Sequence, residues 1–184
     1  MGQYYKPTNL TKKQWLYSHH YDNGLKLMEH SYIGNNFVSA VENLLIAGGA
    51  WYKNSIVWAG DYADEEPENE WTNVQDEYPN KSIYSIIGTD ENEIQPEVVY
   101  RDAKNRWLCN WSKMEFVDLE AVESKDDDWK IHPLPLLTCE GNGRGGGDFH
   151  KEDDRIGTWA RDIISIEENL PDGFREIDGT FIED

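Results

Sequence analysis

The sequence contains no apolar run of about 18 residues, the length that a membrane-spanning helix needs. Its first residues also lack the charged and then apolar pattern of a signal peptide, so we expect a cytoplasmic protein that binds no membrane. Cys109 and Cys139 are too few for a disulfide framework or a zinc site. Basic residues are scarce: 17 Lys and Arg stand against 36 Asp and Glu, a formal net charge of −19. This balance argues against direct nucleic-acid binding, which needs clustered Lys and Arg.

The 184 residues are enough for one domain, and an aromatic content of 12% indicates a packed core. Short strings recur along the chain in the same order. Residues 9–16 resemble 110–117, and residues 58–61 resemble 159–162, both at an offset of 101 positions. We therefore expect a single domain of two related halves, about 1–95 and 102–184, with Trp58 and Trp159 in matching positions of a shared core. Recurring hairpin and turn chemistry is the alternative explanation.

The periodicity of each half predicts a hairpin, then a helix or turn, then a strand. We expect hairpins over 4–17 and 106–119, and a helix over 37–45 that Asn35 or Asn36 caps and Gly48 and Gly49 stop. Pro133 and Pro135 predict that 131–137 is extended or a short turn. Further strands are expected at 56–58, 82–87, 98–101 and 163–166. Together these elements predict an α+β fold with a largely antiparallel sheet.

A glycine-rich string, Gly141-Asn-Gly-Arg-Gly-Gly-Gly-Asp148, is the most unusual motif. Counted from Gly141 to Trp159, it makes this stretch nine residues longer than its counterpart in the first half, so we expect an added loop exposed to solvent. Consecutive glycine N–H groups can form an anion-binding nest, and Arg144 could clamp a phosphate or carboxylate. The alternative is a turn in which Arg144 and Asp148 pair with each other. The candidate ligand-binding residues are Asn142, Arg144, Gly145, Gly146, Gly147, Asp148 and His150.

Four strings resemble a family of small uncharacterised proteins of phages and bacteria. They are Met-Gly-Gln-Tyr-Tyr-Lys at the start, Gly24-Leu-Lys-Leu-Met-Glu29, Trp58-Ala-Gly-Asp-Tyr-Ala-Asp64 and the glycine-rich string. The resemblance covers most of both halves but not residues 65–100. It implies a phage or mobile-element context, and it implies no activity and no catalytic residue.

Acidic residues gather in two segments. Residues 60–97 hold twelve acids and one Lys, and 63–80 is expected to be a solvated excursion; residues 115–128 hold seven acids and one Lys. Spaced carboxylates can imitate a phosphate backbone and occupy a basic groove on another protein. Ordinary solvated surface is the alternative. The candidate partner-binding residues are Glu65, Glu66, Glu68, Glu70, Trp71, Asp126, Asp127 and Asp128.

The leading hypothesis is a non-enzymatic, phage-derived protein that binds a basic host protein. Its target would be a nucleic-acid-handling or defence enzyme, such as a CRISPR effector, blocked by protein–protein binding or by nucleic-acid mimicry. The alternative is a nucleotide binder or hydrolase that uses loop 141–148, with His150 or Asp148 as acid or base. A structural or assembly role is a third hypothesis. We expect no metal, no cofactor and no catalytic residue, because the histidines lie scattered and Cys109 lies in an apolar strand.

Overall fold

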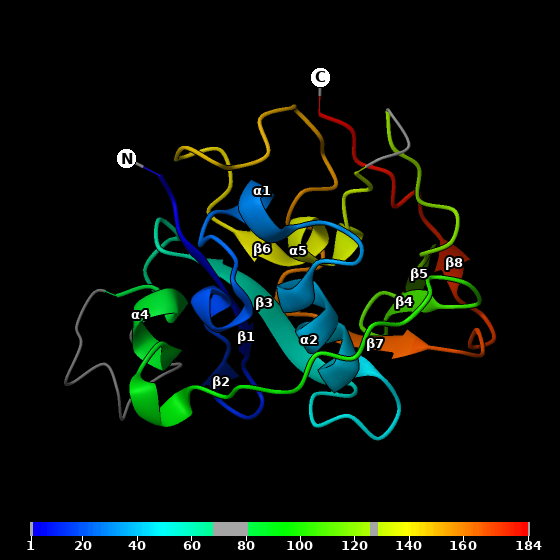
Figure 1. The fold of residues 1–184 in the computed structure, drawn as a ribbon, viewed down its shortest axis with the longest axis horizontal. Coiled ribbons are helices and arrows are strands. Elements are labelled where there is room, and N and C mark those ends of the chain that lie inside the picture. The colour runs from blue at the N-terminus through cyan, green and yellow to red at the C-terminus, as the bar shows by residue number, and fades with distance from the viewer. Residues whose placement is uncertain (1, 68–80, 126–128, 184) are drawn as a thin grey trace.

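The computed structural model describes residues 2–67, 81–125 and 129–183. Within these ranges, eight strands form one sheet in the order β2-β1-β3-β7-β4-β5-β8, and β6 pairs with β3 (Figure 1). Neighbouring strands run antiparallel except for β3 with β6 and β5 with β8. The strands are β1 (Tyr5–Asn9), β2 (Gln14–Trp15), β3 (Asn54–Gly60), β4 (Trp107–Asn110), β5 (Glu115–Asp118), β6 (Cys139–Glu140), β7 (Ile163–Glu167) and β8 (Arg175–Glu176). The predicted α+β class with a mostly antiparallel sheet is confirmed.

Helices pack on both faces of the sheet. Alternate side chains of β3 point to opposite faces: Ile56 and Trp58 join the main apolar core with α2 and α5, whereas Val57 and Ala59 pack against α4. Strand β3 is thus buried on both sides and lies at the centre of the molecule. The described helices are α1 (Leu27–His30), α2 (Asn36–Leu45), α4 (Ile83–Ile87) and α5 (Pro133–Thr138), with short 3-10 turns at Ser18–Tyr21 and Asp90–Asn92.

Helix α2 forms where its sequence pattern predicts it. The side chain of Asn35 accepts hydrogen bonds from the backbone N–H groups of Phe37 at 2.8 Å and Val38 at 3.3 Å, which caps the first turn. After the last turn, Gly49 lies so close to the end of the helix that a Cβ there would be 2.3 Å from the carbonyl oxygen of Leu44. Only glycine fits this approach, so the predicted stop signal is also a packing requirement.

The prediction that 131–137 is extended or a short turn is wrong, because Pro133–Thr138 forms the helix α5. Pro133 and Pro135 fall within the first turn, where backbone N–H groups have no partner inside the helix and proline costs little. The ring of His132 caps this turn by accepting a 3.1 Å hydrogen bond from the N–H of Leu134.

Two predicted strands in the middle of the chain are also wrong. Residues 83–87 form α4, and the spacing of Ile83, Ile86 and Ile87 places all three on one helical face, which packs against Trp15 and Val57. Residues 98–101 form no regular element. The apolar run at 82–87 is short enough to fit either a strand or a helix, and tertiary packing decides between them.

The two hairpins share the same turn contacts. In the β1–β2 turn the side-chain oxygen of Asn9 accepts a 2.9 Å hydrogen bond from the N–H of Lys12. In the β4–β5 turn the side chain of Asn110 accepts a 3.0 Å bond from the N–H of Lys113. Both contacts keep the offset of 101 positions that the sequence shows.

The two central strands, β3 and β7, also make matching contacts with each other. The N–H of Lys53 donates to the carbonyl of Ile164 at 3.1 Å, and the N–H of Arg161 donates to the carbonyl of Ile56 at 2.8 Å. Lys53 and Arg161 both adopt a positive φ, 54° and 69°. Each residue comes just before its strand and bonds to the strand of the other half, at an offset of 108 positions.

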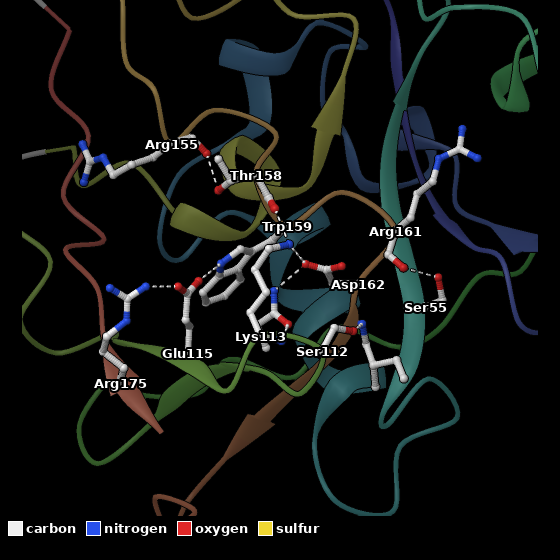
Figure 2. A network of polar contacts seen from close by, with 12 residues as sticks. Ser55, Ser112, Lys113, Glu115, Arg155, Thr158, Trp159, Arg161, Asp162 and Arg175 are labelled. Carbon is white, nitrogen blue, oxygen red and sulfur yellow. Dashed lines mark hydrogen bonds and ion pairs between the residues drawn. The ribbon is translucent and has the colours of Figure 1, made fainter. Parts of the chain in front are cut away.

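The expected match between Trp58 and Trp159 is wrong. The indole of Trp159 donates to the carboxylate of Glu115 on β5 at 2.9 Å (Figure 2), and Trp51 makes the same contact with Gln14 on β2 at 3.0 Å. Trp159 therefore corresponds to Trp51. Trp58 lies within β3, and its indole donates to His30 instead.

The corrected match changes the length of the added segment. The N–H of Trp51 bonds to the carbonyl of Leu44, and the N–H of Trp159 bonds to that of Leu137. Only seven positions separate the first pair, but twenty-two separate the second. The stretch from Leu137 to Trp159 is therefore fifteen residues longer than the stretch from Leu44 to Trp51, not nine, and the glycine-rich loop lies within it.

Candidate functional site

The glycine-rich loop folds back onto the N-terminal residues. The N–H of Gln3 donates to the carbonyl of Gly146 at 3.2 Å, and the N–H of Met28 donates to that of Gly147 at 2.9 Å. A Cβ on Gly145 would lie 2.6 Å from the backbone nitrogen of Gln3. The expectation of an exposed loop is met only in part: Gly143, Arg144 and Gly146 are exposed, but the backbone of the loop packs directly on the body of the protein.

The loop does form a nest of backbone donors, and Asp148 occupies it. The N–H groups of Gly143, Arg144 and Gly145 all donate to the Oδ2 atom of Asp148, at 2.8, 3.1 and 3.0 Å. The other carboxylate oxygen accepts a 2.8 Å hydrogen bond from the hydroxyl of Tyr5. Asp148 is buried, and burial is the main reason that the pKa of Tyr5 is raised. The chain thus supplies its own anion to the site that was predicted to hold a phosphate.

Asn142 and His150 flank this nest in different ways. The side chain of Asn142 accepts from the N–H of Phe149 at 2.9 Å and donates to its carbonyl at 3.0 Å, which closes the loop at its base. His150 is exposed beside it. Asn142 therefore serves the fold of the loop.

Arg144 is the loop residue that points outward. Its guanidinium donates to the carbonyl of Tyr62 at 2.8 Å and to the carboxylate of Asp64 at 2.9 Å. The side chain of Arg144 is 52% exposed and that of Asp64 is 86% exposed. The hydrogen bond to Asp64 raises the pKa of Arg144. Arg144 thus pairs with the acidic segment, whereas Asp148 contacts only its backbone.

A second arginine joins the loop region to the same acidic segment. The guanidinium of Arg161 donates to both carboxylate oxygens of Glu66 and to the carboxylate of Glu140, in a fork geometry that favours carboxylates. Hydrogen bonds to Glu140 and Glu66 raise the pKa of Arg161. In Figure 2 this guanidinium points away from Lys113 and Asp162. Glu66 is buried, so the expectation that it contributes to a solvated acidic surface is wrong.

These contacts border a cleft of about 480 Å³, and its charge is negative. Four carboxylates line it against two arginines, and both arginines already pair with carboxylates. An anion entering the cleft would meet the excess carboxylates, whereas a cation would be attracted. We call this site the acidic cleft; its lining residues are Asp64, Glu65, Glu66, Pro67, Glu140, Gly141, Arg144 and Arg161.

The described flanks of the two acidic segments lie far apart. Asp64 and Glu65 follow β3, whereas Glu120 and Glu123 follow β5, three places further along the sheet (Figure 1). The two flanks thus present separate exposed carboxylates rather than one continuous face. The remaining predicted partner-binding residues, Glu68, Glu70, Trp71, Asp126, Asp127 and Asp128, lie outside the described residues.

Neither cysteine is an activated nucleophile, and the described part of the chain contains no cluster placed to hold a metal ion. Burial is the largest influence on Cys109 and Cys139, and it raises the pKa of each thiol to about 12, so both stay protonated at neutral pH. Among residues 2–67, 81–125 and 129–183, no group of three His, Cys, Asp or Glu side chains is placed to hold a metal ion. In the same ranges, no helix is long and apolar enough to span a membrane.

Sequence reasoning found one side of the acidic cleft and missed the other. Glu65, Glu66 and Arg144 were predicted in separate roles, and the structure brings them together. Arg161 and Glu140 were missed, although a basic residue in so acidic a chain is itself a signal of a carboxylate partner. Comparison with known proteins adds no information: no family model matches the sequence, and no curated protein or solved structure is similar to it.

Proposed function

We propose that this chain is a non-enzymatic binding protein whose acidic cleft engages a basic side chain or segment of another protein. The observation that carries the proposal is the charge of the cleft, where paired arginines leave an excess of carboxylates. Asp64 and Glu65 are exposed at its rim, where Asp64 pairs with the half-exposed Arg144. Exposed carboxylates of this kind increase association rates with basic surfaces and lose their effect in salt.

The partner class follows from the chemistry of complementary surfaces. Enzymes that handle nucleic acids carry basic grooves. The folded body of the protein holds the carboxylates of the acidic cleft in fixed positions, where such a groove can contact them. A host defence enzyme of this kind, in the phage context that the sequence resemblance implies, is the partner we propose. Because the two acidic flanks are separate, one of them contacts the groove while the other remains solvated.

We also propose that the chain arose by internal duplication. Two pairs of equivalent contacts support this origin. The turn contacts of Asn9 and Asn110 lie 101 positions apart, and the tryptophans that bond to the second strand of each hairpin, Trp51 and Trp159, lie 108 positions apart. The sheet order supports it as well: β3 is followed outward by β1 and β2, the first hairpin, and β7 is followed outward by β4 and β5, the second. The acidic cleft lies where the longer second half adds its fifteen-residue segment.

The nucleotide-binding alternative faces a specific obstacle. A phosphate could use the nest only if Asp148 left it, which would break three hydrogen bonds at once and the bond from Tyr5. Nothing at the exposed His150 compensates for that loss. The geometry therefore favours protein binding over the hydrolase hypothesis.

The test is affinity capture from a bacterial host lysate at low and at high salt. The informative variant is Asp64→Asn/Glu65→Gln, and the matched control is Asp172→Asn/Glu176→Gln, which removes the same charge from exposed residues near β8. We expect a basic partner that the wild type and the control retain at low salt and that the cleft variant loses. Equal retention by both variants would refute the proposed site.

A further inference from the structure

Arg106 is buried with most of its hydrogen-bonding capacity unused. The residue is 4% exposed, and its Nη1 atom lies 3.5 Å from the Oε1 atom of Glu42. Within the described part of the chain, its Nε and Nη2 atoms have no hydrogen-bond partner. A guanidinium carries five N–H donors, and leaving buried donors unpaired is costly. Such a group calls for a missing water or ion.

Glu42 only partly satisfies this arginine, because it contacts Nη1 alone, at 3.5 Å, and has a closer partner. The Oε1 atom of Glu42 lies 2.9 Å from the Nε2 atom of His132, which is also buried. Burial alone would raise the pKa of Glu42, but its contacts with His132 and Arg106 outweigh burial, and the pKa is lowered. The carboxylate is thus ionised and held mainly by His132, and Arg106 makes only a long contact with it.

A cavity of about 490 Å³ lies beside Arg106 and has a basic lining. Three of its lining residues are basic and two, Asp102 and Glu168, are acidic, an excess of one positive charge in a chain whose acids outnumber its bases by two to one. Asp102 accepts a 3.0 Å hydrogen bond from the N–H of Lys104, so its carboxylate already serves the local turn. The lining residues are Arg101, Asp102, Lys104, Asn105, Arg106 and Glu168.

We propose that this cavity binds a small oxyanion of the phosphate or carboxylate class. Arg101 and Lys104 are exposed at its rim and would supply charge, while Arg106 would supply paired N–H donors at its base. The free nitrogens of Arg106 are closed off from solvent in this structure, so binding requires its guanidinium to turn toward the cavity and away from the long contact with Glu42. His132 then remains as the partner of that carboxylate.

This site is independent of the acidic cleft and of the glycine-rich nest. The cleft carries excess negative charge, and the nest is filled by Asp148, so both sites disfavour an anion. Arg106 comes directly before β4, which lies between β7 and β5, whereas α4 packs against β1 and β3 at the other end of the sheet. Anion binding, which the sequence suggested for the glycine-rich loop, is thus proposed for the cavity beside Arg106 instead.

The test is a titration that follows the Nε–H resonance of Arg106 by NMR. Inorganic phosphate, acetate and chloride are added separately at constant ionic strength to the wild type, to Arg101→Gln/Lys104→Gln and to the matched control Lys12→Gln/Lys125→Gln. We expect a saturable shift with phosphate in the wild type and control. The rim variant should bind about tenfold more weakly, since two charge-assisted contacts are lost.

Each outcome of this titration is decisive. A response to phosphate but not acetate supports the site and assigns it to phosphate groups, and a response to both supports it and extends it to carboxylates. No saturable shift with either ion would overturn the proposal and leave a buried water as the partner of Arg106. An equal response to chloride, or equal weakening in both variants, would also overturn it, because it would show only general screening of charge.

Discussion

Tyr5 and Asp148 lie 143 positions apart, and the hydroxyl of Tyr5 donates a 2.8 Å hydrogen bond to the carboxylate of Asp148 inside the protein. This contact ties the first strand to the end of the glycine-rich loop. Because the second oxygen of Asp148 holds three backbone N–H groups, one side chain fixes both the conformation of the loop and its position on the body.

Replacing Asp148 should therefore destabilise the protein strongly. The Asp148→Ala variant leaves three N–H groups without their acceptor and leaves the buried Tyr5 hydroxyl with only Gln3 to accept from it, and we expect a loss of about 2–4 kcal/mol in the free energy of unfolding. Urea denaturation measures this loss. Asp154→Ala, at an exposed acidic residue in the same added segment, is the control and should change stability little. Similar effects of the two variants would show that the nest does not stabilise the loop.

The glycines of the loop should differ sharply in their tolerance of alanine. A Cβ at Gly145 meets the backbone nitrogen of Gln3 at 2.6 Å, so Gly145→Ala should cost about 1–3 kcal/mol through forced backbone shifts. The neighbouring Gly146 has space, with its nearest contact at 3.7 Å, and Gly146→Ala should change stability by less than about 0.5 kcal/mol. Thermal or urea unfolding of both variants checks the pair. If both are equally tolerated, the loop does not pack on Gln3.

His30 should make stability depend on pH. It is fully buried, its Nδ1 atom lies 3.0 Å from the carbonyl of Gly24, and its Nε2 atom accepts from the indole of Trp58 at 2.9 Å. Burial lowers its pKa from 6.5 to about 4, and protonation would remove the acceptor that Trp58 uses. Between pH 4 and 6.5, His30 is protonated in the unfolded chain but not in the folded protein. Its contribution to the free energy of unfolding is therefore complete above pH 6.5 and falls as the pH drops toward 4.

The matched variant for this prediction is His30→Gln, whose amide can keep an acceptor for Trp58 and a donor for Gly24. The slope of unfolding free energy against pH between 4 and 6.5 should be smaller in this variant than in the wild type. Urea unfolding at a series of pH values provides the measurement. An unchanged slope would mean that other groups account for the acid sensitivity.

Much of the fold could be predicted from the sequence because local signals decide it. The hairpins depend on turn residues such as Asn9 and Asn110, and α2 depends on the cap at Asn35 and on its apolar spacing. Helix α4 could not be predicted, because a five-residue apolar run fits a strand equally well until Trp15 and Val57 provide a surface for it.

The candidate sites show the same division. The glycine pattern correctly predicts a nest of N–H donors, but its occupant depends on a contact with Tyr5 that no local pattern encodes. Arg161 and Arg106 take their roles from carboxylates 95 and 64 positions away, Glu66 and Glu42. Long-range pairing of this kind becomes visible only when the sheet brings the two halves together.

The central claim, that the acidic cleft binds basic partners, is tested most directly by calorimetric titration of a decalysine peptide at low ionic strength. The three proteins are the wild type, Asp64→Asn/Glu65→Gln and the equally charged control Asp172→Asn/Glu176→Gln. We predict that the cleft variant binds about threefold to tenfold more weakly than the control, since exposed carboxylates contribute modestly and additively. Equal dissociation constants for the two variants would show that only the net charge matters and would contradict the assignment of the cleft.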